Sequence, residues 1–271
     1  MELWSSRDLV WYVAPTGAPA SLTEKQISRV RVIRRTDGYY AQFLVDWDRT
    51  QEHEFQGKMT GIDLGVKEFY TDSDGNTVNN PRFLRKSERR LKRLQRRVSK
   101  KHLSGGKKQS NRYHKARKTL AKQHLKVSRQ REDRARKDAL ALVRSNDLIA
   151  YEDLKIRNMV KNHHLAKSIS DASWYQFTKW LQYFAKVHGV IVIAVPPHHT
   201  TVDCSCCGAK VKKALSTRTH RCNKCGTVLD RDHNAAKNIL AKGFKLLAQY
   251  LNGTVGHTEA GAKSSFIAGR N

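Results

Sequence analysis

The chain has 271 residues and a formal net charge of +28, from 52 lysines and arginines against 24 acids. This length supports one large domain or two modest ones with a buried core. The positive surplus predicts a polyanionic partner, with nucleic acid as the leading class. No apolar run approaches the roughly 18 residues of a membrane-spanning helix, and the start shows no basic segment followed by an apolar one. We therefore expect no membrane partner and a cytoplasmic protein.

The first predicted elements are two β-hairpins. At residues 28–47, a Thr-Asp-Gly-Tyr turn is flanked by apolar residues, which are Val30, Val32, Ile33, Tyr40, Phe43 and Val45. A second hairpin is expected at Met59–Asp72, with a further turn at Asp74-Gly75. Asp63 lies in the middle of its first strand, between apolar neighbours.

Residues 82–137 carry most of the charge, with 24 lysines and arginines against three acids, a net of +21. Leucine and valine repeat there at helical spacing, interrupted by Ser104-Gly105-Gly106, so two long helices in a hairpin are expected. Such charge is often only a solvated helix face, but this one-sided surplus favours binding of a nucleic-acid backbone. The predicted binding residues are Arg85, Lys86, Arg89, Arg90, Lys92, Arg93, Arg96, Arg97 and Lys100.

The second half of the chain alternates strands and helices. A short apolar strand at 147–154 ends in acids, a helix at 173–188 begins with a Ser cap, a strand at 190–195 stops at two prolines, and a last helix covers about 234–251. This order predicts an α/β sheet with a parallel part.

Aromatic and histidine residues in this half have simpler explanations than a binding role. Trp174, Phe177 and Trp180 have helical spacing, so they are expected in the core rather than in a base-stacking platform. The pairs His163-His164 and His198-His199 are expected in loops and are not predicted to bind metal.

All five cysteines fall within 22 residues, which favours a metal site in a reducing compartment over a secreted disulfide framework. Cys204-x-x-Cys207 and Cys222-x-x-Cys225 are separated by fourteen residues, and each pair is followed by Gly. Two such turns can present four thiolates to one tetrahedral, structural zinc ion. Cys206 is not expected to be a ligand.

Three acids stand out by position: Asp63 inside a strand, Glu152 at the end of another, and Asp232 at the start of the last helix. A lone acid in such a place is more often solvated or a helix cap. An RNase H-like sheet, however, brings acids from adjacent strands and a nearby helix to two divalent cations that serve phosphodiester hydrolysis. Asp230 competes with Asp232 for the third position, and Asp232 is preferred because it precedes the Asn-Ala-Ala helix turn.

Six motifs follow one another along the chain: Gly61-Ile-Asp-Leu-Gly65, Tyr151-Glu-Asp-Leu154, Ser168-Ile-Ser-Asp-Ala-Ser-Trp174, Cys204-Ser-Cys-Cys-Gly208, Cys222-Asn-Lys-Cys-Gly226 and Asp230-Arg-Asp-His-Asn-Ala-Ala-Lys-Asn-Ile239. Together they resemble the TnpB family, the OrfB proteins of insertion sequences, which are similar to type V CRISPR effector nucleases. The resemblance implies an α/β, RNase H-like (RuvC) mixed sheet with a basic helical-hairpin insertion and a zinc-ribbon insertion.

The implied activity is RNA-guided DNA cleavage, with a guide RNA from the transposon end and target DNA as partners. Asp63, Glu152 and Asp232 would be the catalytic residues and the ligands of two Mg²⁺ ions, or Mn²⁺. One structural Zn²⁺ would be held by Cys204, Cys207, Cys222 and Cys225.

The implied domain organisation has seven parts: 1–57, an N-terminal segment with a hairpin, the remnant of a wedge-type barrel; 58–81, RuvC part I; 82–144, the basic helical hairpin; 145–200, RuvC part II; 201–229, the zinc ribbon; 230–252, RuvC part III; and 253–271, a flexible tail.

The front of the chain departs from the family, whose members usually carry a much longer N-terminal region, because here 62 residues precede Asp63. A second protein chain that supplies the N-terminal functions is therefore among the expected partners. Two alternative functions stay open: a nuclease-deficient, RNA-guided DNA-binding regulator, and a DNA transposase that performs strand transfer on the same fold.

Overall fold

The computed structural model describes residues 27–45, 50–214 and 216–253. The chain divides into two compact units. Residues 1–49 and 86–129 belong to the first, and residues 50–85 and 130–271 to the second.

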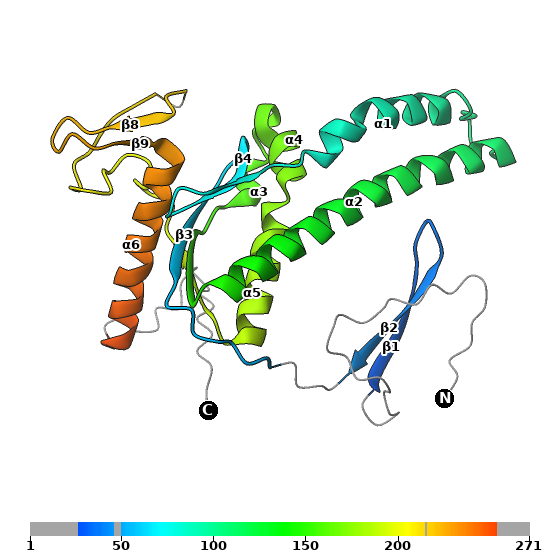
Figure 1. Ribbon diagram of the computed structural model, residues 1–271. Coiled ribbons are helices and arrows are strands. Elements are labelled where there is room, and N and C mark those ends of the chain that lie inside the picture. The colour runs from blue at the N-terminus through cyan, green and yellow to red at the C-terminus, as the bar shows by residue number, and fades with distance from the viewer. Residues whose placement is uncertain (1–26, 46–49, 215, 254–271) are drawn as a thin grey trace. The chain divides into compact units, whose positions relative to one another are not determined.

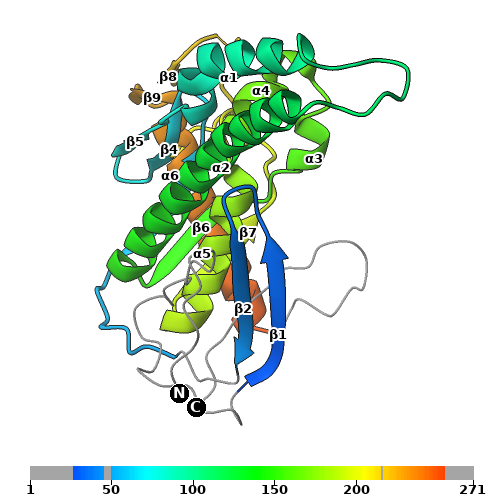
Figure 2. The same ribbon diagram turned by 90° about the vertical axis from the view of Figure 1, so that its right-hand side faces the viewer.

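The first unit contains a β-hairpin and the greater part of two long helices. Strands β1 (Ile27–Arg34) and β2 (Tyr39–Val45) pair antiparallel (Figure 2), and the Arg35 N–H donates to the Gly38 carbonyl oxygen in the turn. This confirms the first predicted hairpin, whose residues 46 and 47 lie outside the described part. In the same unit, the Arg129 guanidinium pairs with Asp37, with 2.6 Å between Nη1 and Oδ2.

Helices α1 (Phe83–Ser99) and α2 (Asn111–Ser145) form the predicted basic pair. Leu91, Leu94 and Val98 are the buried residues of α1, and they are the apolar positions that the sequence spacing indicated. Gln123 of α2 donates to the Ser87 hydroxyl of α1 over 3.4 Å.

The second unit is built on a five-stranded mixed sheet in the order β5-β4-β3-β6-β7. Its strands are β3 (Met59–Leu64), β4 (Glu68–Asp72), β5 (Thr77–Asn79), β6 (Leu148–Glu152) and β7 (Ile191–Val195). Strands β3, β6 and β7 run parallel to one another. On the other side of β3, β4 pairs antiparallel with β3, and the edge strand β5 pairs antiparallel with β4. This confirms the predicted sheet with a parallel part; the three-residue strand β5 was not predicted.

Helices cover both faces of this sheet (Figure 1). On one face, Ile62, Ile149 and Tyr151 pack with residues of the C-terminal part of α2, of α4 (His163–Ala172) and of α5 (Trp174–His188). On the other face, Leu148, Ala150, Ile193 and Val195 pack with Ile239 of α6 (Arg231–Leu251). Alternate residues of β6 therefore serve opposite layers, as the pleat of a strand requires.

The predicted aromatic core is confirmed in large part. Phe177 is fully buried and Trp174 is 3% exposed. Trp180 is half-buried beneath the Arg136 guanidinium, 5.4 Å from the ring centroid.

Three local predictions were wrong. His163 and His164 begin α4 rather than lying in a loop, because the Asn162 side chain accepts the His164 N–H and caps that helix. Ser173 precedes α5, but its side chain caps nothing, because its backbone is left-handed (φ 59°) where α4 ends. The last helix starts at Arg231, since Asp230 is its N-cap.

The cysteine segment contains the short antiparallel pair β8 (Thr219–Arg221) and β9 (Val228–Asp230). A four-residue helix, α3 (Ile156–Met159), precedes α4. Within the described ranges, none of the helices combines the length and the apolar character needed to cross a membrane.

Two glycines let α6 approach the sheet closely. A Cβ added at Gly61 of β3 would lie 2.6 Å from the Leu240 backbone N and closer still to the Ala236 carbonyl oxygen. A Cβ added at Gly243 of α6 would lie 2.7 Å from the Ala150 Cβ. Any larger residue at either position would push the helix away from β3 and β6.

We expect Gly61→Ala to lower the free energy of unfolding by about 1–3 kcal/mol, because the new methyl group meets helix backbone that cannot rotate aside. Urea denaturation measures the change. Gly106→Ala is the comparison: its Cβ meets nothing within 4 Å, and its left-handed backbone (φ 70°) costs only about 1 kcal/mol. Equal stability of the Gly61 variant and the wild type would contradict the close packing of α6.

Candidate active site

The alternation of β3 and β6 places two of the predicted acids on the same face of the sheet. Ile62 and Leu64 of β3 belong to the cluster on the α5 side, so Asp63 between them points to the α6 side. By the same alternation, Glu152 follows Tyr151 of the α5-side cluster and also points to the α6 side.

The register of the two parallel strands makes these acids neighbours. Gly61 of β3 is paired with Ala150 of β6, and Ile62 is paired with Tyr151. The next residue is Asp63 on β3 and Glu152 on β6, so the two acids occupy neighbouring positions. Both acids lie at the carboxyl ends of parallel strands, where open α/β sheets bind ligands.

Helix α6 adds the third acid, Asp232, in its first turn. The pKa of Asp63 is raised well above its ordinary value, first by burial and then by the charges of Glu152 and Asp232. Glu152 and Asp232 therefore lie close enough to Asp63 to oppose the ionisation of Asp63. They do not form a tight ligand group, because among the described residues only a cysteine cluster has ligand atoms that all lie within 4.8 Å of one another.

Glu152 is held in a buried setting, with 7% of its surface exposed. The Thr200 hydroxyl donates a 2.5 Å hydrogen bond to its Oε1 atom. Burial raises the pKa of Glu152, while the Thr200 hydrogen bond and the positive charge of Lys242 act in the opposite direction.

The two competing acids of α6 have different local roles. The Asp230 carboxylate is the N-cap and accepts the N–H groups of Asp232 and His233, at 2.8 and 3.4 Å. Asp232 is not used in this cap; its oxygens pair with Arg218 at 3.2 Å and Arg231 at 3.0 Å. A cap side chain contributes about 1 kcal/mol to the helix, so Asp230 has a structural role in α6 that the Asp232 side chain does not share.

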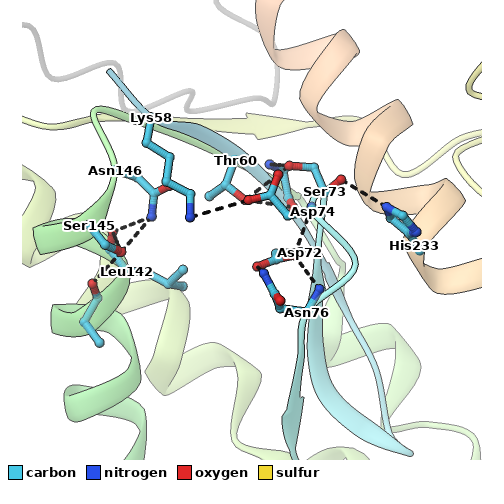
Figure 3. A network of polar contacts seen from close by, with 12 residues as sticks. Lys58, Thr60, Asp72, Ser73, Asp74, Asn76, Leu142, Ser145, Asn146 and His233 are labelled. Atoms are coloured by element: carbon cyan, nitrogen blue, oxygen red, sulfur yellow. Dashed lines mark hydrogen bonds and ion pairs between the residues drawn. The ribbon is translucent and has the colours of Figure 1, made fainter. Parts of the chain in front are cut away.

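A turn between β4 and β5 holds α6 in place next to β3 (Figure 3). The His233 Nε2 atom lies 3.1 Å from the Ser73 carbonyl oxygen, and the Ser73 hydroxyl accepts the Gly61 N–H at 3.2 Å. The Asp72 carboxylate orders the turn by accepting the N–H groups of Asp74 and Asn76. The start of α6 is therefore tied to the strand that carries Asp63.

The turn at Asp74-Gly75 was predicted from the sequence, but its contact with α6 was not, and sequence reasoning also missed a second set of residues. Asn234 is fully buried, and it bonds to the backbone of Asp203 and Ser205 beside the first cysteine pair. The signal was present in the sequence, because Asn234 and Asn238 are four residues apart and therefore lie on one face of the helix.

The four cysteines form a compact group whose sulfur atoms are close enough together to hold one metal ion, as expected. Cys204 and Cys225 are 3.7 Å apart between sulfur atoms, and Cys207 and Cys222 are 3.6 Å apart. Cys206 is exposed and lies outside this group. Four sulfur donors in this arrangement fit the ligand set of a zinc ribbon.

The two cysteine turns have the same construction. Gly208 donates its N–H to the Cys204 carbonyl oxygen, and Gly226 donates to that of Cys222, with φ near 70° at both glycines. Hydrogen bonds from the side chain and backbone of Thr227 lower the pKa of Cys225 to about 6, which favours the thiolate form that binds metal.

The basic face of α1 is available to a ligand. All nine residues predicted to contact nucleic acid are exposed. In the described part of the chain, Lys92 alone of these nine pairs with an acid, Glu88, at 2.9 Å. The other eight cations have no acidic partner among the residues that the structure describes.

Comparison with known proteins gives two matching family models and several relatives. Residues 42–163 match the OrfB family, described as "Probable transposase", and residues 174–239 match "Cas12f1-like, TNB domain". A "Putative RNA-guided DNA endonuclease" of Streptomyces pristinaespiralis is 38% identical over 186 residues, which cover 68% of this chain and 45% of that protein. InsQ of Escherichia coli K12, with the same description, is 34% identical over 206 residues, which cover 70% of this chain and 50% of InsQ.

The chain thus spans about half the length of these two relatives. A cryo-electron microscopy structure of Cas12f1 with sgRNA and target DNA has a TM-score of 0.50 and 16% identity, over 78% of this chain and 55% of that one. At this identity the likeness concerns the fold alone.

We expect one zinc ion per chain in the purified protein, because the four sulfur atoms form a closed ligand set. Cys222→Ser should lose the ion and the order of β8 and β9. Cys206→Ser removes an exposed thiol outside the group and is the matched control. Elemental analysis measures the zinc content, and full retention by the Cys222 variant would contradict the ligand assignment.

We expect Asp63→Asn to raise the melting temperature in Mg²⁺-free buffer. The pKa of Asp63 is higher in the folded than in the unfolded protein. The protonated carboxyl group therefore contributes its full share to the stability of the fold below about pH 4, and this contribution is lost as the pH rises through the folded-state pKa. The amide stays neutral, so the gain should be larger at pH 8 than at pH 5. Asp153→Asn changes an exposed acid and is the control. If the Asp63 variant melts at the wild-type temperature at pH 8, the ionised Asp63 carboxylate does not destabilise the fold and the expectation is wrong.

Proposed function

Because the chain belongs to the TnpB (OrfB) family, we propose that it is a transposon-encoded, RNA-guided, metal-dependent DNA endonuclease with an RNase H-like (RuvC) core. The observation that carries this proposal is the convergence of Asp63, Glu152 and Asp232 at one end of the sheet. Three elements far apart in the sequence supply these carboxylates, and each acid has a buried or polar setting suited to a site rather than to a solvated surface.

The three carboxylates fit divalent magnesium or manganese, which prefer oxygen ligands. Two such ions, when bound, would activate water and stabilise the leaving oxygen of a phosphodiester. In the protein, Asp63 and Glu152 must give up their protons to serve as ligands, and their raised pKa values make cation binding compete with protonation. Arg218 pairs with Oδ2 of Asp232 and Arg231 with Oδ1, so both arginines compensate the charge of this carboxylate.

The remaining features have consistent roles in such an enzyme. A closed four-cysteine zinc site would be structural, since it leaves no open position for water. The exposed cations of α1 would contact the backbone of a guide RNA paired with target DNA, where contacts depend on charge and shape rather than on base sequence.

The family description as a transposase supports one second candidate, strand transfer. The same fold and ions can serve either chemistry. Joined DNA products indicate strand transfer, whereas simple breaks indicate an endonuclease. The RNA that copurifies with the protein provides the guide for this assay, and a discrete RNA from a transposon end is the expected result.

We expect Asp63→Ala and Glu152→Ala to reduce Mg²⁺-dependent DNA cleavage about 1,000-fold or more, because each removes a ligand from the reacting centre. Binding of guide and target should persist, since α1 is unchanged. Asp153→Ala, which removes the exposed acid beside Glu152, should cleave at the wild-type rate. Time courses with a matched guide give the rates, and wild-type cleavage by either active-site variant would refute the assignment.

A further inference from the structure

One face of α6 carries three polar residues at intervals of four, Asn234, Asn238 and Lys242. Side chains at this spacing line up along one side of a helix. All three bond to the backbone of residues 196–205, the segment that joins β7 to the first cysteine pair. We call this segment the connecting loop.

The bonds from α6 extend over the connecting loop. At one end, Lys242 Nζ donates to the carbonyl oxygens of Pro196 and His198. In the middle, Asn238 Nδ2 donates to the carbonyl oxygen of Thr200 at 2.8 Å.

The other end of the loop is held next to the cysteines. Asn238 Nδ2 also donates to the Asp203 carbonyl oxygen at 2.7 Å, and Asn234 Nδ2 donates to the same oxygen at 2.9 Å. The Asn234 Oδ1 atom accepts the Ser205 N–H at 3.0 Å. The position of the loop is therefore set by a single helix face.

Thr200 lies in the middle of this loop and is only 3% exposed. Asn238 donates a hydrogen bond to the carbonyl oxygen of Thr200, and the hydroxyl of Thr200 donates to Glu152 Oε1. Within the described part of the chain, the Oε2 atom of Glu152 accepts no hydrogen bond. The Thr200 hydroxyl thus occupies one carboxylate oxygen of Glu152 and leaves the other available.

We propose that Thr200 is a positioning residue: its hydroxyl, held by α6 through the connecting loop, orients Glu152 so that the free oxygen is presented to a divalent cation. This inference rests on the proposed metal-dependent function. Outer ligands of this kind orient metal-binding carboxylates and typically contribute about 10- to 100-fold to metal affinity. The same loop continues into the cysteine group, so the order of the ribbon and the geometry of Glu152 are connected.

Mn²⁺ titration of the zinc-loaded full chain, followed by electron paramagnetic resonance, tests the proposal without DNA or guide. Thr200→Val keeps the branched shape and removes the hydroxyl, so its Mn²⁺ affinity should fall about 10- to 100-fold. Thr200→Ser keeps the hydroxyl and should bind nearly as well as the wild type. Thr201→Val makes the same chemical change one residue away and is the matched control.

Zinc content and melting temperature identify variants that fold, and Thr200→Ala replaces Thr200→Val if the latter does not fold. Wild-type Mn²⁺ affinity of a folded variant without the hydroxyl would overturn the positioning role, as would a Ser variant as weak as the Val variant. Absence of Mn²⁺ binding by the wild type would overturn both this role and the metal-dependent function. If the variants show the expected order of Mn²⁺ affinities but the protein cuts no DNA, the positioning role of Thr200 is supported and only the proposed nuclease activity is refuted.

Discussion

The close packing of α6 against β3 is the contact on which the candidate site depends. Gly61 leaves no Cβ between the strand and the helix backbone at Ala236 and Leu240. This lets the first turn of α6, with Asp232, lie beside the strand ends that carry Asp63 and Glu152. The His233 contact to the β4–β5 turn restrains the same end of the helix (Figure 3). A small residue in a strand therefore sets the distance between acids that are far apart in the sequence.

The site combines groups that oppose one another electrostatically. Asp63 is half-buried, and its neighbours Glu152 and Asp232 add negative charge. Arginines pair with Asp232, and the Thr200 hydroxyl contacts Glu152, so two of the three acids are compensated within the fold. At Asp63 the positive charge of Arg231 does not outweigh burial and the charges of Glu152 and Asp232, so a divalent cation would relieve the most repulsion there. Such a site costs folding stability in return for its chemistry.

Helix α6 also connects the three acids of the candidate site to the cysteine group. Its first turn supplies Asp232, and its polar face at Asn234, Asn238 and Lys242 holds the loop that leads to Cys204. The cysteine turns are local structures that their own glycines and backbone hydrogen bonds define. Their place beside the sheet is set by side-chain bonds from the helix, in particular those of the buried Asn234.

The sequence by itself determined the features that depend on short-range patterns. Alternation and turn residues predicted both hairpins and the parallel strands, helical spacing predicted the buried face of α1, and the doubled Cys-x-x-Cys pattern predicted the cysteine group. Helix α4 was missed because its polar residues resemble a loop, and only the Asn162 cap defines its start.

Only the tertiary structure decided the partners of polar groups, because these come from elements distant in the sequence. Asp230 and Asp232 were competing candidates in the sequence; the fold separates them, since one caps α6 and the other pairs with Arg218 and Arg231. The hydrogen bond between Thr200 and Glu152 joins residues 48 positions apart, and no local pattern reports it. The identity of the acids was readable from the sequence, whereas their convergence required the packing of α6 on the sheet.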